Sequence, residues 1–183
     1  MPAPRDWLTL TIPPLGDGRC AVAPGTRPFA AADAQALARL MLDSYRGSVD
    51  DGGETLDDAR RDVGRLLAGD FGTVDWGACT VVERQGTLAS ATILTRDRVA
   101  PPPLETGEAF LAFSMTAPAF KRRGLARSGL SHVIATLQSR GEPRLHLVVT
   151  RTNIPAVRLY RSIGFVEGPI GGQSGHCPGI PRP

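Results

Sequence analysis

Apolar residues recur along the first part of the chain at the spacing of amphipathic helices. One such pattern runs from Phe29 to Tyr45 and a second from Leu56 to Leu67, and both place their apolar residues on one helical face. Thr55 and Asp58 form a capping-box pattern before the second run, and Gly69 follows it. The sequence therefore predicts two helices here, with the second beginning after Thr55 and ending at Gly69.

The pattern then changes to the alternation typical of strands. The runs Cys79–Glu83 and Leu88–Thr95 are separated by Arg84-Gln85-Gly86-Thr87, which predicts a β-hairpin. Leu145–Val149 is almost entirely apolar, as in a strand that is buried on both faces. Further strands are predicted at Trp7–Ile12, at Glu108–Thr116 and from Phe165 onward.

Two more helices are predicted between these later strands, at Leu125–Arg140 and at Asn153–Ile163. The resulting order of helices and strands indicates an α/β (α+β) fold, in which a mixed sheet carries helices on both faces. Residues 1–167 fit a single domain. Residues 168–183 form a Gly/Pro-rich C-terminal tail, since the last twenty residues contain six glycines and four prolines.

Composition narrows the possible classes of function. The formal net charge of the 183-residue chain is +3, which is too small to indicate nucleic-acid binding. The three cysteines and three histidines show no disulfide or metal-ligand spacing. No apolar run approaches the ~20 residues of a membrane span. We expect a cytoplasmic protein with no metal, no nucleic-acid partner and no membrane partner.

The segment Lys121–Ala126 reads Lys-Arg-Arg-Gly-Leu-Ala and stands between a predicted strand and a predicted helix. A helix N-terminus suits a pyrophosphate, because its N–H groups have no partner within the helix and the helix dipole is positive there. Gly124 permits unusual dihedral angles and Ala126 keeps the approach open. The residues expected to contribute are Lys121, Arg122, Arg123, Gly124, Leu125, Ala126 and Arg127. The alternative is a basic loop that precedes an ordinary helix.

Asn153 and Tyr160 are seven residues apart, close to the ~7.2 residues of two helical turns. Both side chains are therefore expected on one face of the last helix. Asn153 can cap the helix or hydrogen-bond a ligand chain, and the Tyr160 phenol can protonate or hydrogen-bond a leaving thiolate. The alternative is a capped amphipathic helix with a buried tyrosine.

The two motifs together resemble the cofactor site of the GCN5-related N-acetyltransferases, with the strongest similarity over residues 108–167. The matching positions of the second motif are Asn153, Ala156, Tyr160, Gly164 and Phe165. Lys121 departs from the family pattern, which has Gln or Arg at that position. The resemblance implies a mostly antiparallel sheet that splays between two parallel central strands.

The same resemblance implies an enzyme. Acetyl-CoA would be the co-substrate, and a primary amine would attack its thioester directly in a ternary complex. Tyr160 would act as general acid toward the CoA thiolate. The backbone of Ser114, Met115 and Thr116 would contact the pantetheine arm.

The general base is less well defined by the sequence. Some relatives use a glutamate on the strand before the phosphate loop, and Glu108 is the best-placed carboxylate of this kind. Its alternative role is that of a solvated residue at a strand start. Glu83 and Asp97 are weaker candidates, and a water chain is a further one.

An acidic segment surrounds the break between the first two predicted helices, at Asp50, Asp51, Glu54, Asp57 and Asp58. In relatives this region often borders the acceptor groove, so these carboxylates would attract a cationic amine on a small molecule, peptide or protein. The alternative is a solvated loop and an acidic first helical turn.

Two other features depart from a simple enzyme assignment. Relatives usually finish with an apolar strand, whereas the tail here has almost no strand pattern; an exposed sheet edge is therefore expected, which a homodimer would cover. A CoA-binding or sensor module with weak or no turnover is the alternative function. A nucleic-acid binder that uses the Lys121–Arg127 loop is a third one, which the lack of interleaved aromatic residues disfavours.

Overall fold

The computed structural model describes residues 4–12, 22–97 and 107–167. Its elements are, in order, β1 (Arg5–Thr11), β2 (Thr26–Pro28), η1 (Ala31–Asp33), α1 (Ala34–Tyr45), α2 (Leu56–Ala68), β3 (Thr73–Val74), β4 (Thr80–Arg84), β5 (Thr87–Arg96), β6 (Ala109–Thr116), η2 (Pro118–Phe120), α3 (Leu125–Ser139), β7 (Arg144–Thr150), α4 (Ile154–Ile163) and β8 (Val166–Glu167). The predicted tail 168–183 lies outside the described residues. None of the described helices is long and apolar enough to cross a membrane.

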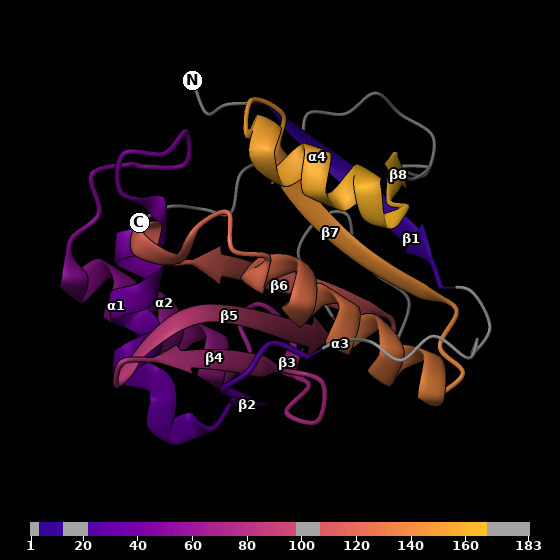
Figure 1. The fold of residues 1–183 in the computed structure, drawn as a ribbon, viewed down its shortest axis with the longest axis horizontal. Helices are drawn as coiled ribbons and strands as arrows, with labels where there is room; N and C mark the ends of the chain where they lie inside the picture. Colours follow the sequence, from indigo (N-terminus) through magenta and orange to yellow (C-terminus); the bar gives the residue numbers. More distant parts are fainter. Residues whose placement is uncertain (1–3, 13–21, 98–106, 168–183) are drawn as a thin grey trace.

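The described strands form one eight-stranded sheet in the order β2-β4-β5-β6-β7-β1-β8, with β3 paired to β5. Every pairing between these described strands is antiparallel except that of β6 with β7. Helices α3 and α4 cover one face of the sheet, and α1 and α2 lie on the other (Figure 1). This arrangement confirms the predicted fold class, including the parallel pair at the centre of the sheet.

Local signals in the sequence determine several element boundaries. The Thr55 side chain accepts a hydrogen bond from the Asp58 N–H at 3.3 Å, and the Asp58 carboxylate accepts one from the Thr55 N–H at 2.9 Å. This reciprocal pair confirms the capping box of α2, and Gly69 ends the helix with a φ of +92°. The short strands β2 and β3 were not predicted, because two or three residues carry no periodic signal.

The N-terminal strand occupies a position that the sequence did not indicate. β1 pairs antiparallel with β7 over seven residue pairs, from Arg5 opposite Thr150 to Thr11 opposite Arg144. β8 then pairs with the outer side of β1. The chain's own first strand therefore covers this edge of β7.

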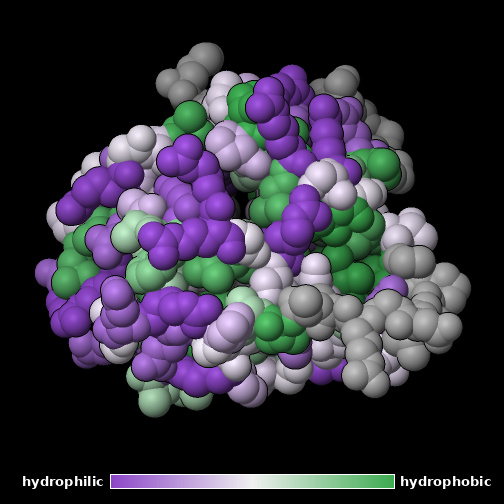
Figure 2. Space-filling view, in the orientation of Figure 1, coloured by the Kyte–Doolittle hydropathy of each residue, from purple (hydrophilic) through white to green (hydrophobic). Residues whose placement is uncertain are grey.

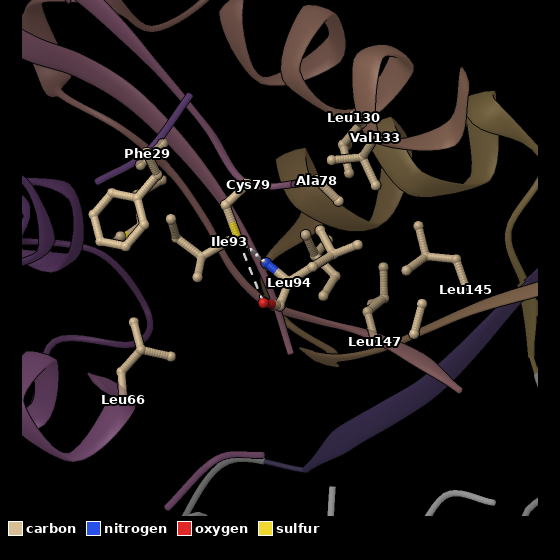
Figure 3. Packing of buried hydrophobic residues seen from close by; sticks show 14 of the residues in the cluster. Phe29, Leu66, Ala78, Cys79, Ile93, Leu94, Leu130, Val133, Leu145 and Leu147 are labelled. Atoms are coloured by element: carbon tan, nitrogen blue, oxygen red, sulfur yellow. Dashed lines mark hydrogen bonds between the residues drawn. The ribbon is translucent and has the colours of Figure 1, made fainter. Parts of the chain in front are cut away.

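The core lies on both faces of β5. Figure 3 shows Ile93 on the side of Phe29 and Leu66, whereas Leu130 and Val133 of α3 pack over the opposite side. The buried Cys79 thiol donates to the Leu94 carbonyl at 3.4 Å, and its sulfur accepts from the Leu94 N–H at 3.2 Å. This packing holds the central strands rigidly beside the site described below.

Candidate active site

The parallel pair β6 and β7 separates part of the way along its length. Pairing ends at Leu111 opposite Leu147, while β6 continues to Thr116. On its other side β6 pairs with β5, and that register skips Ala112 at the same level. Such a bulge bends the strand, so β6 turns away from β7 and opens a wedge between them (Figure 1).

A cavity of about 220 Å³ lies in this wedge. β6 contributes Ser114, β7 contributes Thr150, and α4 contributes Asn153 and Tyr160. The end of α1 and the loop after it form the remaining wall. Figure 2 shows a hollow in the surface between the α1 side and the α4 side, with hydrophilic residues around its mouth.

Tyr160 is buried in this cavity, with 8% of its surface exposed. Its ring packs edge-to-face against Phe165, with centroids 5.7 Å apart. Burial raises the pKa of Tyr160 to about 12, the hydrogen bond with Ser114 opposes this shift, and the negative charge of Asp50 adds to it. The phenol therefore stays protonated at neutral pH and can act as a proton donor.

Asn153 begins α4 and faces the same cavity as Tyr160, as the seven-residue spacing predicted. Its side-chain oxygen accepts from the Ala156 N–H at 3.3 Å, which caps the helix. Its amide nitrogen donates to Asp50 Oδ2 at 3.1 Å. Asn153 thus joins the start of α4 to the loop between α1 and α2, a contact that spacing alone did not predict.

The segment Lys121–Ala126, called the phosphate loop below, forms the turn into α3. Gly124 is the N-cap residue with a φ of +78°, and no side chain in the described part of the chain caps the helix there. This contrasts with α2 and α4, where Thr55 and Asn153 provide side-chain caps. The N–H groups of the first turn, at Leu125, Ala126 and Arg127, have no acceptor within the helix, and an anionic ligand can satisfy them.

Most basic side chains of this segment have partners within the protein. Lys121 Nζ donates to the Ser44 carbonyl at 3.4 Å, at the end of α1. The Arg123 guanidinium lies 5.4 Å from the centre of the Phe120 ring.

Arg127 donates to Ser162 Oγ of α4 at 2.5 Å. Arg122 adopts a φ of +62°, which is rare for a side-chain-bearing residue. These contacts shape the loop, so its backbone rather than its side chains is the better match to a pyrophosphate.

The end of β6 is a second set of predicted ligand contacts. Ser114 lines the cavity, whereas the Met115 side chain is buried in the core. The Met115 carbonyl accepts from Ser90 Oγ at 2.7 Å, and Thr116 Oγ1 lies 3.1 Å from the same hydroxyl. These bonds fix the end of β6 against β5. On the opposite side of β6, which faces the wedge, the described residues show no pairing with β7 beyond Leu111.

Glu108 does not lie with the other predicted site residues. It immediately precedes β6, at the end of the sheet where β6 and β7 are still paired. Its carboxylate lies 3.2 Å from Arg144 Nε and 3.5 Å from His146 Nε2, and it is absent from the residues that line the cavity. Among the described residues, Glu108 therefore lies outside the cavity that holds Tyr160.

The acidic segment divides between two locations. Asp50, Asp51 and Glu54 line the cavity, while Asp57 and Asp58 form surface ion pairs with arginines in the first turns of α2.

Asp62 of α2 also lines the cavity, although no motif in the sequence marks it. Desolvation raises the pKa of Asp62. The charges of Arg65 and Arg61 oppose this shift, whereas the nearby Asp58 and Glu54 carboxylates add to it. Among the described residues, no group of three His, Cys, Asp or Glu side chains is arranged to hold a metal ion.

The fold agrees with comparisons to known proteins. Residues 35–165 match the Acetyltransferase (GNAT) family. Because this match spans well over half of the chain, the protein belongs to that family.

A curated relative from Salmonella typhimurium, the [ribosomal protein bS18]-alanine N-acetyltransferase, is 47% identical over 53 residues. The match covers 29% of this chain and 36% of the relative, so the chain aligns with only about a third of that protein's length.

Two solved structures share the fold. The ribosomal-protein-S18-alanine N-acetyltransferase from Escherichia coli superposes with a TM-score of 0.56 at 22% identity, over 78% of this chain and 77% of that one. The aminoglycoside N-acetyltransferase AAC(6')-Iy, solved in complex with CoA, superposes with a TM-score of 0.57 at 15% identity, over 78% of this chain and 87% of that one. At these identities the likeness concerns the fold.

Proposed function

We propose that the protein is an N-acetyltransferase that moves the acetyl group of acetyl-CoA to a primary amine. The observation that carries this proposal is the buried phenol of Tyr160 inside the wedge between β6 and β7. The family match and the relatives named as N-acetyltransferases support the same class of reaction. The amine attacks the thioester directly while both substrates are bound.

The residues present fit acetyl-CoA as the acetyl donor. The uncapped N-terminus of α3 at Gly124 suits the pyrophosphate. The part of β6 beyond Leu111, around Ser114, suits the pantetheine arm, because a strand edge can hydrogen-bond an extended amide chain. The thioester then lies near Tyr160, where a proton is available for the leaving sulfur.

Tyr160 supplies that proton in the proposed mechanism. Collapse of the tetrahedral intermediate breaks the C–S bond, and the electron pair leaves on sulfur. A phenol beside the sulfur protonates it as the bond breaks, which lowers the barrier to expulsion. The hydrogen bond with Ser114 holds the phenol oriented before the reaction.

The test follows release of free CoA thiol from acetyl-CoA with pools of polyamines, aminoglycosides, amino acids and short peptides. We expect release with at least one pool. In the Tyr160→Phe variant we expect kcat to fall by about 10²-fold or more, with little change in the KM for acetyl-CoA. Phenylalanine keeps the ring packing against Phe165, so the variant isolates the hydroxyl.

Binding of acetyl-CoA, measured by calorimetry, separates the two functions considered for this fold. Binding without thiol release from any pool would contradict the transferase and favour a CoA-binding module. Thiol release that is equal in wild type and Tyr160→Phe would leave the reaction class standing and remove the general-acid role of Tyr160.

A further inference from the structure

One carboxylate of the cavity is hydrogen-bonded to two residues on the β7 side of the wedge. Asp50 lies in the loop between α1 and α2 and lines the cavity together with Tyr160. Its Oδ1 accepts a hydrogen bond from Thr150 Oγ1 at 2.5 Å, across 100 residues of sequence. Its Oδ2 accepts from Asn153 Nδ2 at 3.1 Å. The carboxylate is thus fixed at the end of β7 and the start of α4.

This attachment distinguishes Asp50 from the acidic residues beside it. The Asp51 carboxylate accepts from the N–H groups of Gly47 and Gly53, and the Glu54 carboxylate accepts from the Gly52 N–H. Those two side chains therefore bond backbone groups of their own loop. Asp50 reaches out of the loop to the strand and helix that carry the other site residues.

Asp50 and Tyr160 act on each other electrostatically across the cavity, because the charge of Asp50 contributes to the raised pKa of Tyr160. Both groups also contribute to the raised pKa of Tyr45, for which burial is the main cause. One cavity therefore holds a hydrogen-bonded carboxylate and a protonated phenol. Acid–base catalysis uses such pairs, in which one group takes a proton and the other gives one.

We propose that Asp50 is the catalytic proton acceptor for the amine, held in position by Thr150 and Asn153. This inference rests on the transferase function proposed above. It assigns to a loop residue the role for which the sequence suggested Glu108, whose carboxylate is paired with Arg144 outside the cavity.

The proton balance of the reaction is complete with these groups. The acceptor enters as an ammonium and loses one proton to Asp50, which passes it to water. The amine lone pair then forms the C–N bond, and the resulting intermediate loses its second N–H proton to Asp50. The C–S bond breaks, sulfur takes a proton from Tyr160, and the phenolate regains one from Asp50. One proton is released overall.

Other charged groups face Asp50 and must be considered in any pH profile. The carboxylates of Asp51, Glu54 and Asp62 line the same cavity. Arg5 of β1 and Arg46 after α1 supply positive charge, and Tyr45 adds a second phenol. A control variant therefore has to remove one negative charge without entering the cavity. Asp57 meets this condition, because its side chain is 80% exposed and pairs with Arg60 on the surface.

The experiment compares wild type, Asp50→Asn and Asp57→Asn with acetyl-CoA and whichever of spermidine, kanamycin or an alanine-initiated tripeptide releases thiol. We expect Asp50→Asn to lower kcat by about 10²–10⁴-fold with unchanged acetyl-CoA binding by calorimetry. Its remaining rate should rise about tenfold per pH unit up to the pKa of the acceptor amine, because without the base only the amine that is already unprotonated in solution can react. Formate should restore activity to Asp50→Ala, and Asp57→Asn should behave as wild type.

Thr150→Val tests the positioning role and serves if Asp50→Asn does not fold. This variant keeps the Asp50 carboxylate and removes the hydroxyl that orients it. We therefore expect kcat to fall while the shape of the pH profile is retained. Thr150→Ser keeps a hydroxyl and should recover the rate. An unchanged kcat in Asp50→Asn overturns the proposal. If Asp50→Asn is unfolded, an unchanged kcat in Thr150→Val overturns it instead. So does a change confined to the KM for the amine. Absence of thiol release by wild type overturns the transferase function itself, and this role of Asp50 with it.

Discussion

At the scale of single residues, the site depends on groups whose chemistry is changed by burial. Tyr160 is the clearest case, because its phenol is almost fully enclosed and its pKa is raised to about 12 by burial. A phenol in this environment costs free energy to ionise. The same property that keeps it ready to protonate a thiolate makes the fold sensitive to alkaline pH.

We predict that the free energy of unfolding falls as pH rises above about 10, the pKa of tyrosine in the unfolded chain. The folded pKa is raised, so this stability is present below pH 10 and is lost as pH approaches 12. Over this pH range, the free energy of unfolding of the Tyr160→Phe variant should fall by about 2–3 kcal/mol less than that of wild type. Urea unfolding at pH 8 and pH 11.5 measures the difference. Equal losses in both proteins would show that the phenol is not enclosed as described.

At the scale of elements, the contact of α3 with the sheet depends on a residue without a side chain. Gly129 of α3 is buried against β5, and a Cβ at this position would lie 2.2 Å from Thr92 Oγ1 and 3.2 Å from Thr92 Cβ. α3 begins at the phosphate loop, so this close approach also sets the position of the loop relative to the wedge.

The Gly129→Ala variant should therefore be destabilised by about 1–3 kcal/mol, because overpacking a tight contact displaces the helix or the strand. Gly64→Ala in α2 is the matched control. A Cβ there meets nothing within 4 Å, so the substitution should be neutral or stabilising by up to about 1 kcal/mol. Thermal and urea unfolding of both variants measure the contrast. If Gly129→Ala were as stable as its control, the close approach of α3 to β5 would be wrong.

At the scale of the whole molecule, an ion-pair network joins parts of the chain that are distant in sequence. Asp75, which lies before β4, bonds Arg96 of β5 at 2.6 Å and Arg140 at the end of α3 at 2.6 Å. Glu142 completes the network through Arg96 at 2.7 Å. Burial alone would raise the pKa of Asp75, but the hydrogen bonds from Arg140 and Arg96 outweigh it and hold the pKa below its usual range.

This lowered pKa predicts a loss of stability in acid. The contribution of Asp75 is present above about pH 4, the pKa of an unfolded aspartate, and is lost as pH falls through the folded value. Asp75→Asn should lower the free energy of unfolding at pH 7 by about 1.5–3 kcal/mol, because Arg96 and Arg140 lose charge-assisted hydrogen bonds while Glu142 still pairs with Arg96. The variant should also weaken the decline in stability between pH 5 and pH 2.5. Urea unfolding across this range measures it. An acid decline as steep in the variant as in wild type would place its origin elsewhere in the molecule.

Much of the fold was predictable because its signals are local. The hairpin turn at Gln85-Gly86, where both residues have positive φ, and the cap at Thr55 each need only a few neighbouring residues to specify them. The motif around Gly124 and the shared face of Asn153 and Tyr160 were predictable for the same reason. Glu108 was harder to judge, because a strand position does not reveal whether a side chain faces a wedge or an ion pair.

The amino-acid sequence by itself determined the longer elements, the two ends of α2, the phosphate-loop motif and the paired positions on the last helix, because backbone propensity and periodicity act over a few residues. Only the tertiary structure decided that β1 closes the sheet beside β7, and that Asp50 meets Thr150 and Asn153 in the wedge. These contacts join segments about 100 residues or more apart. They form because chain segments without a local signal for each other are brought together when the common core is buried.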